Sequence, residues 1–263
     1  MTNYNSSTTT HDAEIVDQFS RQAEAFAQAA ALHNERALDL LVTAGEPSAS
    51  DQSLDVACGP GTIVIAFAKR VRHATGLDAT EAMLAQGRQK AAAEGIANVA
   101  WSRGSVYTLP FRDGAFDIVS CRFAFHHLER PAEAFAEMIR VCRRGGRIVL
   151  CDACCSDDPA KAAAFNRMER FRDPSTVEFR TLGFLRALFR DAALPEPKLA
   201  TYAVPADTSR LIEGSFPVNN DREGLRRMIE ESVAGDTMGV GARFGEQGVE
   251  FSYPAAVLSA AKA

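Results

Sequence analysis

A short apolar run that ends in a glycine-rich turn carries the strongest chemical signal in this sequence. The run and the turn occupy residues 54–61, Leu-Asp-Val-Ala-Cys-Gly-Pro-Gly. Such a run is typical of a buried parallel strand, and Gly59 and Gly61 allow the backbone to turn sharply and to approach a ligand closely. Residues 62–71 then carry apolar side chains followed by basic ones, as at the end of a helix. A strand, a glycine turn and a helix in this order indicate a site for a nucleotide-type cofactor.

A second acidic residue stands where a ribose could be bound. Residues 73–78 read as a strand that ends in Asp78, 23 positions after Asp55. The two oxygens of a carboxylate at a strand end can accept hydrogen bonds from both ribose hydroxyls. A surface aspartate is the alternative. A dinucleotide site also needs a glycine or alanine at position 64, where this chain has Val64, so the spacing disfavours NAD.

Strands and helices alternate along the rest of the chain. Apolar runs predict further strands at 98–101, 147–152, 195–204 and 251–260, and a fourth strand that follows a turn within 111–119 and ends at 120–122. Helical spacing predicts helices over 80–94, 131–141, 160–172, 181–192 and 225–233. This alternation predicts an α/β fold with a mostly parallel sheet.

Three stretches in matching order resemble class I S-adenosylmethionine (SAM)-dependent methyltransferases. They are D-x-A-C-G-x-G at 55–61, L-P-F-x-D-x-x-F-D-x-V at 109–119, and R-x-G-G-x-I at 143–148. The chain is most similar to the ubiquinone/menaquinone-biosynthesis methyltransferase-like (methyltransferase type 11) group. The resemblance covers roughly residues 50–155, and Ala57 replaces the more usual first glycine.

The resemblance implies a Rossmann-like, doubly wound sheet of seven strands with helices on both faces. The implied order is 3-2-1-4-5-7-6, with an antiparallel last strand. We expect residues 12–263 to form one methyltransferase domain, and the Ser/Thr/Asn-rich residues 1–11 to be disordered. Residues 12–45 would form a helical N-terminal cover, and 156–248 would contain insertions that cover the substrate.

SAM is the cofactor that the resemblance implies. Ser105 stands where the family often has an aspartate that binds adenine, and a hydroxyl is a weaker acceptor than a carboxylate. The cofactor-binding residues that we predict are Asp55, Ala57, Gly59, Gly61, Asp78, Ala79, Met83, Gly104, Ser105, Val106, Cys121 and Arg122.

Two adjacent histidines follow the fourth predicted strand, at the rim where open α/β sheets hold ligands. Methyl transfer from a sulfonium is an in-line displacement, so the protein chiefly aligns the two reactants. A base is needed only when the acceptor arrives protonated, and His126 and His127 are the candidates. Adjacent residues point differently, so one can serve the site while the other has a structural role.

Two phenylalanines and two arginines are candidates to contact the acceptor. Phe19 and Phe26 lie in a segment that resembles the one covering SAM in small-molecule methyltransferases, or else they belong to the core. Arg167 and Arg170 could bind an anionic group, but interleaved acidic residues favour a solvated helix face.

Composition excludes several classes of partner. A net charge of −5 gives no overall attraction for nucleic acid or an anionic membrane, and no apolar run approaches the ~20 residues of a membrane span. We expect a cytoplasmic protein that acts on a small molecule. The six cysteines lack the spacing of a zinc site, so we expect buried thiols and no metal. A homodimer, a non-catalytic SAM sensor or scaffold, and a NAD-dependent oxidoreductase remain open, as does the identity of the acceptor.

Overall fold

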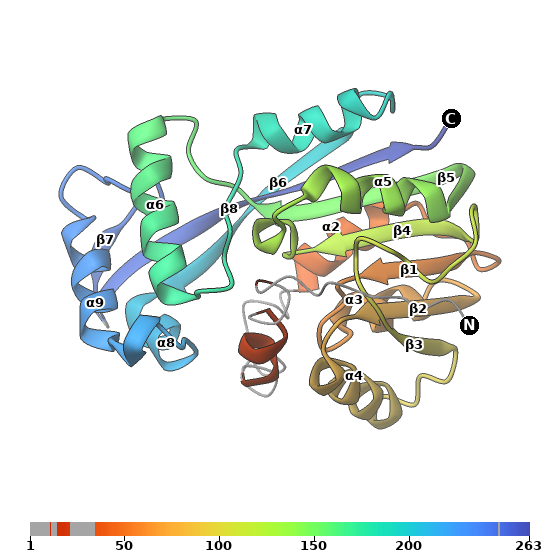
Figure 1. Ribbon diagram of the computed structural model, residues 1–263, viewed down its shortest axis with the longest axis horizontal. Helices are drawn as coiled ribbons and strands as arrows, with labels where there is room; N and C mark the ends of the chain where they lie inside the picture. Colours follow the sequence, from red (N-terminus) through yellow and green to blue (C-terminus); the bar gives the residue numbers. More distant parts are fainter. Residues whose placement is uncertain (1–10, 12–14, 22–34, 247) are drawn as a thin grey trace, which may run out of the picture.

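A twisted sheet forms the middle of the molecule (Figure 1). The computed structural model describes residues 11, 15–21, 35–246 and 248–263. The strands are β1 (Gln52–Val56), β2 (His73–Asp78), β3 (Val99–Arg103), β4 (Phe116–Arg122), β5 (Cys142–Ala153), β6 (Lys198–Asp207), β7 (Arg243–Gly245) and β8 (Gly248–Ala261). Their order is β3-β2-β1-β4-β5-β8-β6, and β8 runs antiparallel to β5 and β6. The predicted mostly parallel Rossmann-like sheet with an antiparallel last strand is confirmed.

The described sheet has one strand more than the seven that we predicted. The additional strand is β7, whose three residues pair only with the beginning of β8. β8 is 14 residues long, and its first residues extend far enough to pair with both β7 and the end of β6. The sequence showed only a glycine-rich turn before this strand, because a three-residue strand carries no readable periodicity.

Helices cover both faces of the sheet. They are α2 (Glu35–Ala44), α3 (Thr62–Ala68), α4 (Glu81–Ala93), η2 (Phe125–His127), α5 (Pro131–Val141), α6 (Pro159–Arg172), α7 (Leu182–Asp191), α8 (Thr208–Glu213), η3 (Val218–Asn220) and α9 (Arg222–Glu231). α5 and α7 pack on one face through Phe135 and Phe189, whereas α2 and α3 pack on the other through Leu41 and Phe67. Adjacent strand residues point to opposite faces, so Ile118 joins the second core and Val119 the first. The central strands are therefore buried on both sides.

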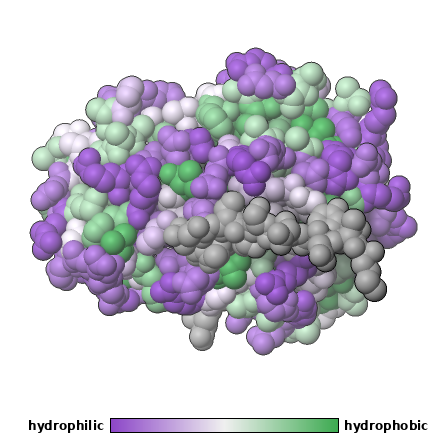
Figure 2. Space-filling view, in the orientation of Figure 1, coloured by the Kyte–Doolittle hydropathy of each residue, from purple (hydrophilic) through white to green (hydrophobic). Residues whose placement is uncertain are grey.

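A third hydrophobic cluster lies beyond the carboxyl end of β5. It joins Phe165 and Met168 of α6 to Leu225 of α9 and to Phe251 near the start of β8. In Figure 1 this group of helices stands apart from those that flank the central strands. Most of residues 156–248 thus build a core of their own. Figure 2 shows hydrophilic residues over much of the surface, with smaller hydrophobic patches between them.

Successive strands are added to one side of β1 up to β3, and from β4 onward they are added to its other side. β1 pairs with β2 on one side and with β4 on the other, all in parallel. At such a point the connections leave toward opposite faces and a crevice opens outside the carboxyl ends of the strands. The helical segment 15–21, red in Figure 1, lies at these strand ends. In the described residues, no helix has the length and hydrophobicity needed to cross a membrane.

Candidate cofactor and acceptor site

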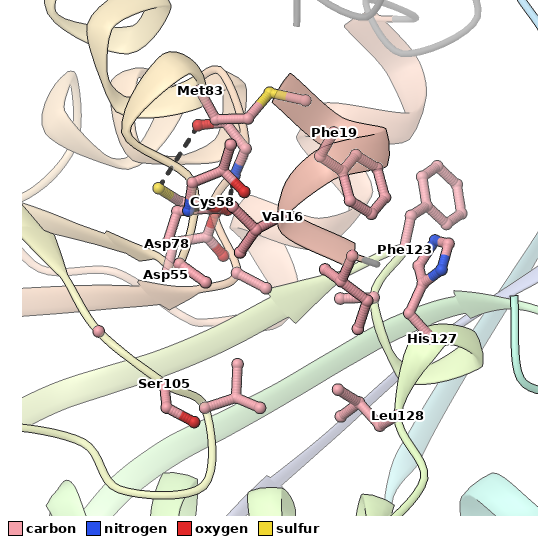
Figure 3. A pocket seen from close by; sticks show the side chains of 18 of the residues that line it. Val16, Phe19, Asp55, Cys58, Asp78, Met83, Ser105, Phe123, His127 and Leu128 are labelled. Atoms are coloured by element: carbon pink, nitrogen blue, oxygen red, sulfur yellow. Dashed lines mark hydrogen bonds between the residues drawn. The ribbon is translucent and has the colours of Figure 1, made fainter. Parts of the chain in front are cut away.

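A cavity of about 710 Å³ opens at the carboxyl ends of the central strands (Figure 3). This volume lies within the range of small-molecule sites. Its wall contains ten of the twelve residues predicted to bind the cofactor, namely Asp55, Ala57, Gly59, Asp78, Ala79, Met83, Gly104, Ser105, Val106 and Arg122. Phe19 and His127 also line it. Residues far apart in the sequence are therefore brought to one site by the strand order.

The two glycines of the turn after β1 have different surroundings. Both have left-handed backbones, with φ of 52° at Gly59 and 76° at Gly61. A Cβ added to Gly59 would meet no atom within 4 Å, and Gly59 lines the cavity. A Cβ on Gly61 would lie 2.3 Å from Cη2 of Trp101, and Gly61 does not line the cavity. Gly59 leaves room for a ligand, whereas Gly61 makes room for the indole ring.

Close packing between α3 and β2 uses a glycine on the strand. Val64 is buried, and a Cβ added to Gly76 would lie 2.9 Å from its Cγ2 atom. The same Cβ would lie 2.8 Å from the Sγ atom of Cys58. A dinucleotide fingerprint places its small residue on the helix, so the arrangement here differs from that of NAD-binding folds.

Two residues of the wall that are not glycine have left-handed backbones. The φ angles are 54° at Ala57 and 55° at Phe123. This region is disfavoured for residues with a Cβ, and such strain concentrates at ligand sites. Ala57 occupies the position where the related motif usually has glycine, and its φ angle explains that preference.

Asp78 already accepts two backbone hydrogen bonds at the end of β2. Its Oδ2 atom accepts from the N–H of Gly59 at 2.8 Å, and Oδ1 accepts from the N–H of Thr80 at 2.8 Å. Burial raises the pKa of Asp78, although these bonds partly oppose the rise. The carboxylate therefore ties the glycine turn to β2 and keeps further lone pairs at the cavity wall.

Asp55 and Arg122 lie side by side at the ends of β1 and β4. Ser120 Oγ donates a 2.7 Å hydrogen bond to Oδ1 of Asp55. Burial raises the pKa of Asp55 to about 7, while the bond from Ser120 and the charge of Arg122 lower it. The guanidinium of Arg122 also lies 4.6 Å from the ring centre of Phe123. The cavity floor thus holds one buried carboxyl group and one buried cation.

The far end of the cavity is formed by Met83 and by the turn after β3. Met83 is buried, and Gly104 donates its N–H to the carbonyl of Asp78 at 3.0 Å. Ser105 is exposed, and its Oγ accepts the N–H of Tyr107 at 3.2 Å. The hydroxyl that replaces the usual acidic residue thus stabilises its own turn.

His127 presents one ring nitrogen toward the cavity. Its Nδ1 atom lies 3.0 Å from the carbonyl oxygen of Ser175, and Phe19 packs edge-on at 4.9 Å between ring centres. A carbonyl can only accept, so Nδ1 carries the hydrogen and Nε2 has a lone pair. Burial and the neighbouring His126 lower the pKa of His127 to about 4. The ring is therefore neutral near pH 7.

His126 has a structural environment and does not line the cavity. Its Nδ1 atom lies 2.7 Å from Oδ1 of Asp152, and its backbone N–H donates to Oδ2 of the same residue at 3.0 Å. Phe179 stacks on the ring at 4.1 Å between centres. Of the two candidate histidines, His127 is therefore the one that lies at the cavity, because Asp152 and Phe179 hold His126 behind the wall.

Several other predicted site residues lie elsewhere. Arg167 and Arg170 are exposed and do not line the cavity, because α6 buries the opposite side, with Phe165 and Met168, in the third cluster. They thus lie on the solvated helix face that the interleaved acidic residues favoured, away from this cavity. Cys121 is buried in the first core beneath the wall. Phe26 lies outside the described residues.

The sequence did not identify part of the wall on the acceptor side. Val16, Phe123 and Leu128 line it together with Phe19 and His127 (Figure 3). Phe123 and Leu128 immediately flank the two histidines, so their position at a strand end was a signal that could have found them. The sequence analysis also missed Tyr107 and Arg130, which line the cavity. The guanidinium of Arg130 lies 4.2 Å from the centre of the Tyr107 ring.

The residues present fit SAM. Gly59 provides a cradle that a Cβ would fill, and Asp78 offers carboxylate oxygens at the same point. Asp55 and Arg122 supply a hydrogen-bonding carboxyl group and a cation, which match the amino and carboxylate groups of a methionine moiety.

Comparison with known proteins agrees with this geometry. Residues 54–150 match the family model described as a methyltransferase domain. The chain is 28% identical to the uncharacterized methyltransferase YcgJ of Bacillus subtilis over 93% of its own length and 97% of that protein. The crystal structure of YcgJ superposes with a TM-score of 0.79 at 27% identity, covering 87% of this chain and 99% of the other.

A second relative is the ubiquinone/menaquinone biosynthesis C-methyltransferase UbiE of Roseobacter denitrificans. It is 40% identical over 46% of this chain, and the match spans 49% of that protein. The similarity thus covers about half of UbiE and is confined to part of both chains. The methyltransferase-domain match over residues 54–150, these relatives and the shared fold together support a SAM-dependent methyltransferase.

Proposed function

We propose that this methyltransferase transfers the methyl group of SAM, by in-line displacement, to a small and largely apolar molecule with an O–H or N–H group. The observation that carries the proposal is the division of one cavity into two parts. The part near Asp78 is rich in hydrogen-bonding groups, whereas the part near His127 is bounded by apolar and aromatic side chains.

The cofactor part has a group for each portion of SAM. We assign Asp78 to the ribose hydroxyls, since a charged acceptor makes strong hydrogen bonds with hydroxyl groups. Met83 and Val106 would flank the adenine, and Asp55 and Arg122 would bind the methionine end. When bound, SAM supplies an electrophilic methyl group on a sulfonium.

The acceptor part favours an apolar molecule. Val16 and Phe19 from segment 15–21 line it together with Phe123 and Leu128, and Phe19 lies close to Phe123 and His127 (Figure 3). Burying an apolar ring between such side chains excludes water and fixes the nucleophile relative to the methyl group. We therefore assign the role of cover to the described part of residues 12–45.

His127 is the group that we assign to the acceptor's hydrogen. Its Nε2 lone pair would accept a hydrogen bond from the O–H or N–H and orient the nucleophile. As the new bond to the methyl group forms, the acceptor's proton would pass to Nε2 and then to solvent after the product leaves. Because burial and His126 lower the pKa of His127 to about 4, proton transfer contributes less than for a base matched to neutral pH.

The remaining proposals concern context. A net charge of −5 favours a small molecule over nucleic acid as the acceptor. Six free cysteines suit a reducing compartment such as the cytoplasm. We assign residues 156–248 to the support of the site and not to its wall, since none of the described residues in this range lines the cavity. A homodimer stays open.

Binding experiments should separate SAM from other cofactors. Thermal-shift measurements with SAM, S-adenosylhomocysteine and NAD at about 100 times the Kd should show stabilisation of about 2.7 kcal/mol by the first two alone. Stabilisation by NAD and not by SAM would refute the proposal.

Methyl transfer should then be measured with labelled SAM and a panel of apolar phenols, hydroxyl compounds and amines. We expect His127→Ala to lower turnover by about 10- to 100-fold with unchanged SAM affinity, because the ring acts on the acceptor. His73→Ala, at the opposite end of β2, is the matched control. Full turnover of the His127 variant across pH 6 to 9 would remove the histidine from the mechanism.

A further inference from the structure

A loop outside the matched methyltransferase segment holds the cavity histidine from behind. Residues 173–181 connect α6 to α7, whereas the family match ends at residue 150. None of these loop residues lines the cavity. Nevertheless, the backbone N–H groups of Val177 and Glu178 donate to the carbonyl of His126 at 2.9 and 3.0 Å. The loop is thus fastened directly to η2, the short helix that carries both histidines.

A buried chain of hydrogen bonds runs through this loop to His127. Oδ1 of Asp173 accepts from Ser175 Oγ at 2.6 Å and from the Ser175 N–H at 3.0 Å. The carbonyl of Ser175 then accepts from Nδ1 of His127 at 3.0 Å, with Ser175 Oγ 3.2 Å from the same nitrogen. All three residues are buried, with at most 5% of their surfaces exposed. Asp173 therefore fixes Ser175 at two points, and Ser175 fixes the ring.

The direction of these bonds determines where the imidazole hydrogen lies. Ser175 Oγ donates to the carboxylate, so it is an acceptor toward Nδ1, as is the carbonyl. Two acceptors on one side of the ring hold the hydrogen on Nδ1. Among the described residues, none forms a hydrogen bond with Nε2 of His127, and the ring lines the cavity. The opposite tautomer would turn a donor toward the acceptor's O–H or N–H.

The surroundings of His127 contain groups that lower its pKa and groups that raise it. Burial and His126 lower its pKa, whereas Asp173 and, more weakly, Asp152 raise it. Arg172 lies next to Asp173 and helps to keep that carboxyl group ionised, as do the bonds from Ser175. The carboxylate of Asp173 is thus the anion that favours proton uptake by His127 most strongly.

We propose that Asp173 and Ser175 are positioning residues that fix His127 as the Nδ1–H tautomer and aim its Nε2 lone pair at the methyl acceptor. The role of His127 toward the acceptor rests on the proposed function, but the tautomer itself does not. Neither positioning residue touches cofactor or acceptor. Their contribution passes through the imidazole alone.

Nitrogen NMR of protein with ¹⁵N-labelled histidine tests the tautomer without any substrate. The full chain should show His127 protonated at Nδ1 and unprotonated at Nε2 at pH 7. We expect Asp173→Ala to give a mixture of tautomers, because Ser175 loses both of its anchors. Asp173→Asn keeps an acceptor oxygen at Oδ1 and should largely retain the Nδ1–H form. An Nε2–H tautomer in the unmodified protein would overturn the proposal.

Steady-state kinetics of the same variants tests whether the tautomer of His127 affects turnover. Asp173→Ala should lower kcat roughly tenfold, the equivalent of one lost hydrogen bond, with little change in the KM for SAM. Asp173→Asn should restore part of kcat. Ser232→Ala is the matched control, because Ser232 is also buried and donates to a backbone carbonyl in α9.

The two failures can be told apart. If calorimetry shows no SAM binding by the unmodified protein, the proposed function fails while the tautomer result stands on its own. If SAM binds but Asp173→Ala changes neither the tautomer nor kcat, the positioning role is wrong. Should Asp173→Ala not fold, Ser175→Ala is used. It must then weaken the Nδ1–H preference and lower kcat, and an unchanged spectrum and rate would overturn the proposal.

Discussion

Replacing Gly61 and Gly59 separately by alanine would show which glycine of the turn serves packing and which serves the cofactor. At Gly61 the new Cβ would lie 2.3 Å from Cη2 and 2.7 Å from Cζ3 of Trp101, and 3.3 Å from Cα of Gly87. The left-handed backbone adds about 1–2 kcal/mol of strain, and overpacking adds about 1–3 kcal/mol. Alanine also lowers the conformational entropy of the unfolded chain, which offsets about 0.4–1 kcal/mol of this destabilisation.

We therefore expect Gly61→Ala to lower the free energy of unfolding by about 2–4 kcal/mol. For a chain of this size the melting temperature should fall by about 4–12 °C. Gly59→Ala is destabilised only by the strain of its left-handed backbone, since its Cβ has no neighbour within 4 Å. Its free energy of unfolding should fall by no more than about 1.6 kcal/mol, but its Cβ would occupy the cofactor cradle.

Denaturant unfolding and calorimetry with SAM on both variants provide the test. The expected pattern is a large loss of stability for Gly61→Ala and a large loss of SAM affinity for Gly59→Ala. If Gly61→Ala unfolds like the unmodified protein, the packing of Trp101 against the turn is wrong. If instead Gly59→Ala binds SAM normally, the cradle is not part of the site.

Three further variants test the cavity wall. Ala57→Gly should raise the free energy of unfolding by about 0.5–1 kcal/mol in denaturant titrations, since the left-handed backbone suits glycine, and any loss of stability would contradict the assigned strain. Asp78→Ala should weaken SAM binding by about 1–3 kcal/mol in calorimetry through the loss of ribose hydrogen bonds, and an unchanged Kd would remove Asp78 from the site. Burial raises the pKa of Asp55 to about 7 in the folded protein, so its stabilising contribution is complete below pH 4 and is lost as pH rises toward 7. The stability of Asp55→Asn relative to the unmodified protein should therefore increase by on the order of 2–4 kcal/mol between pH 4 and 8, and a constant difference would contradict the raised pKa.

The family resemblance predicted the strand order, and local patterns predicted part of the cofactor wall. Residues 54–61 carry their own signal, and an acidic residue at the end of the next strand must reach the same edge of a parallel sheet. Asp78 and Gly59 were thus predicted, and the structure joins them by a 2.8 Å hydrogen bond. Ser105 was predicted because the resembling family often has an aspartate at this place, and Met83 because it lies on the inner side of the helix that follows Asp78.

Features that depend on distant partners could not be predicted in the same way. Gly61 is required by Trp101, which lies 40 residues later on β3. The sequence shows two equivalent histidines, but Asp152 draws one behind the wall and Ser175 orients the other toward the cavity. The packing of α6 in the third hydrophobic cluster likewise depends on α9 and β8, which meet it only in the folded chain.

The most direct test of this account is a crystal structure of the protein with S-adenosylhomocysteine. We predict that the ligand occupies the cavity with its ribose hydroxyls within hydrogen-bond distance of Asp78 and its sulfur directed toward the side bounded by Phe19 and His127. A ligand that binds outside this cavity, or inside it with the ribose away from Asp78, would contradict the account.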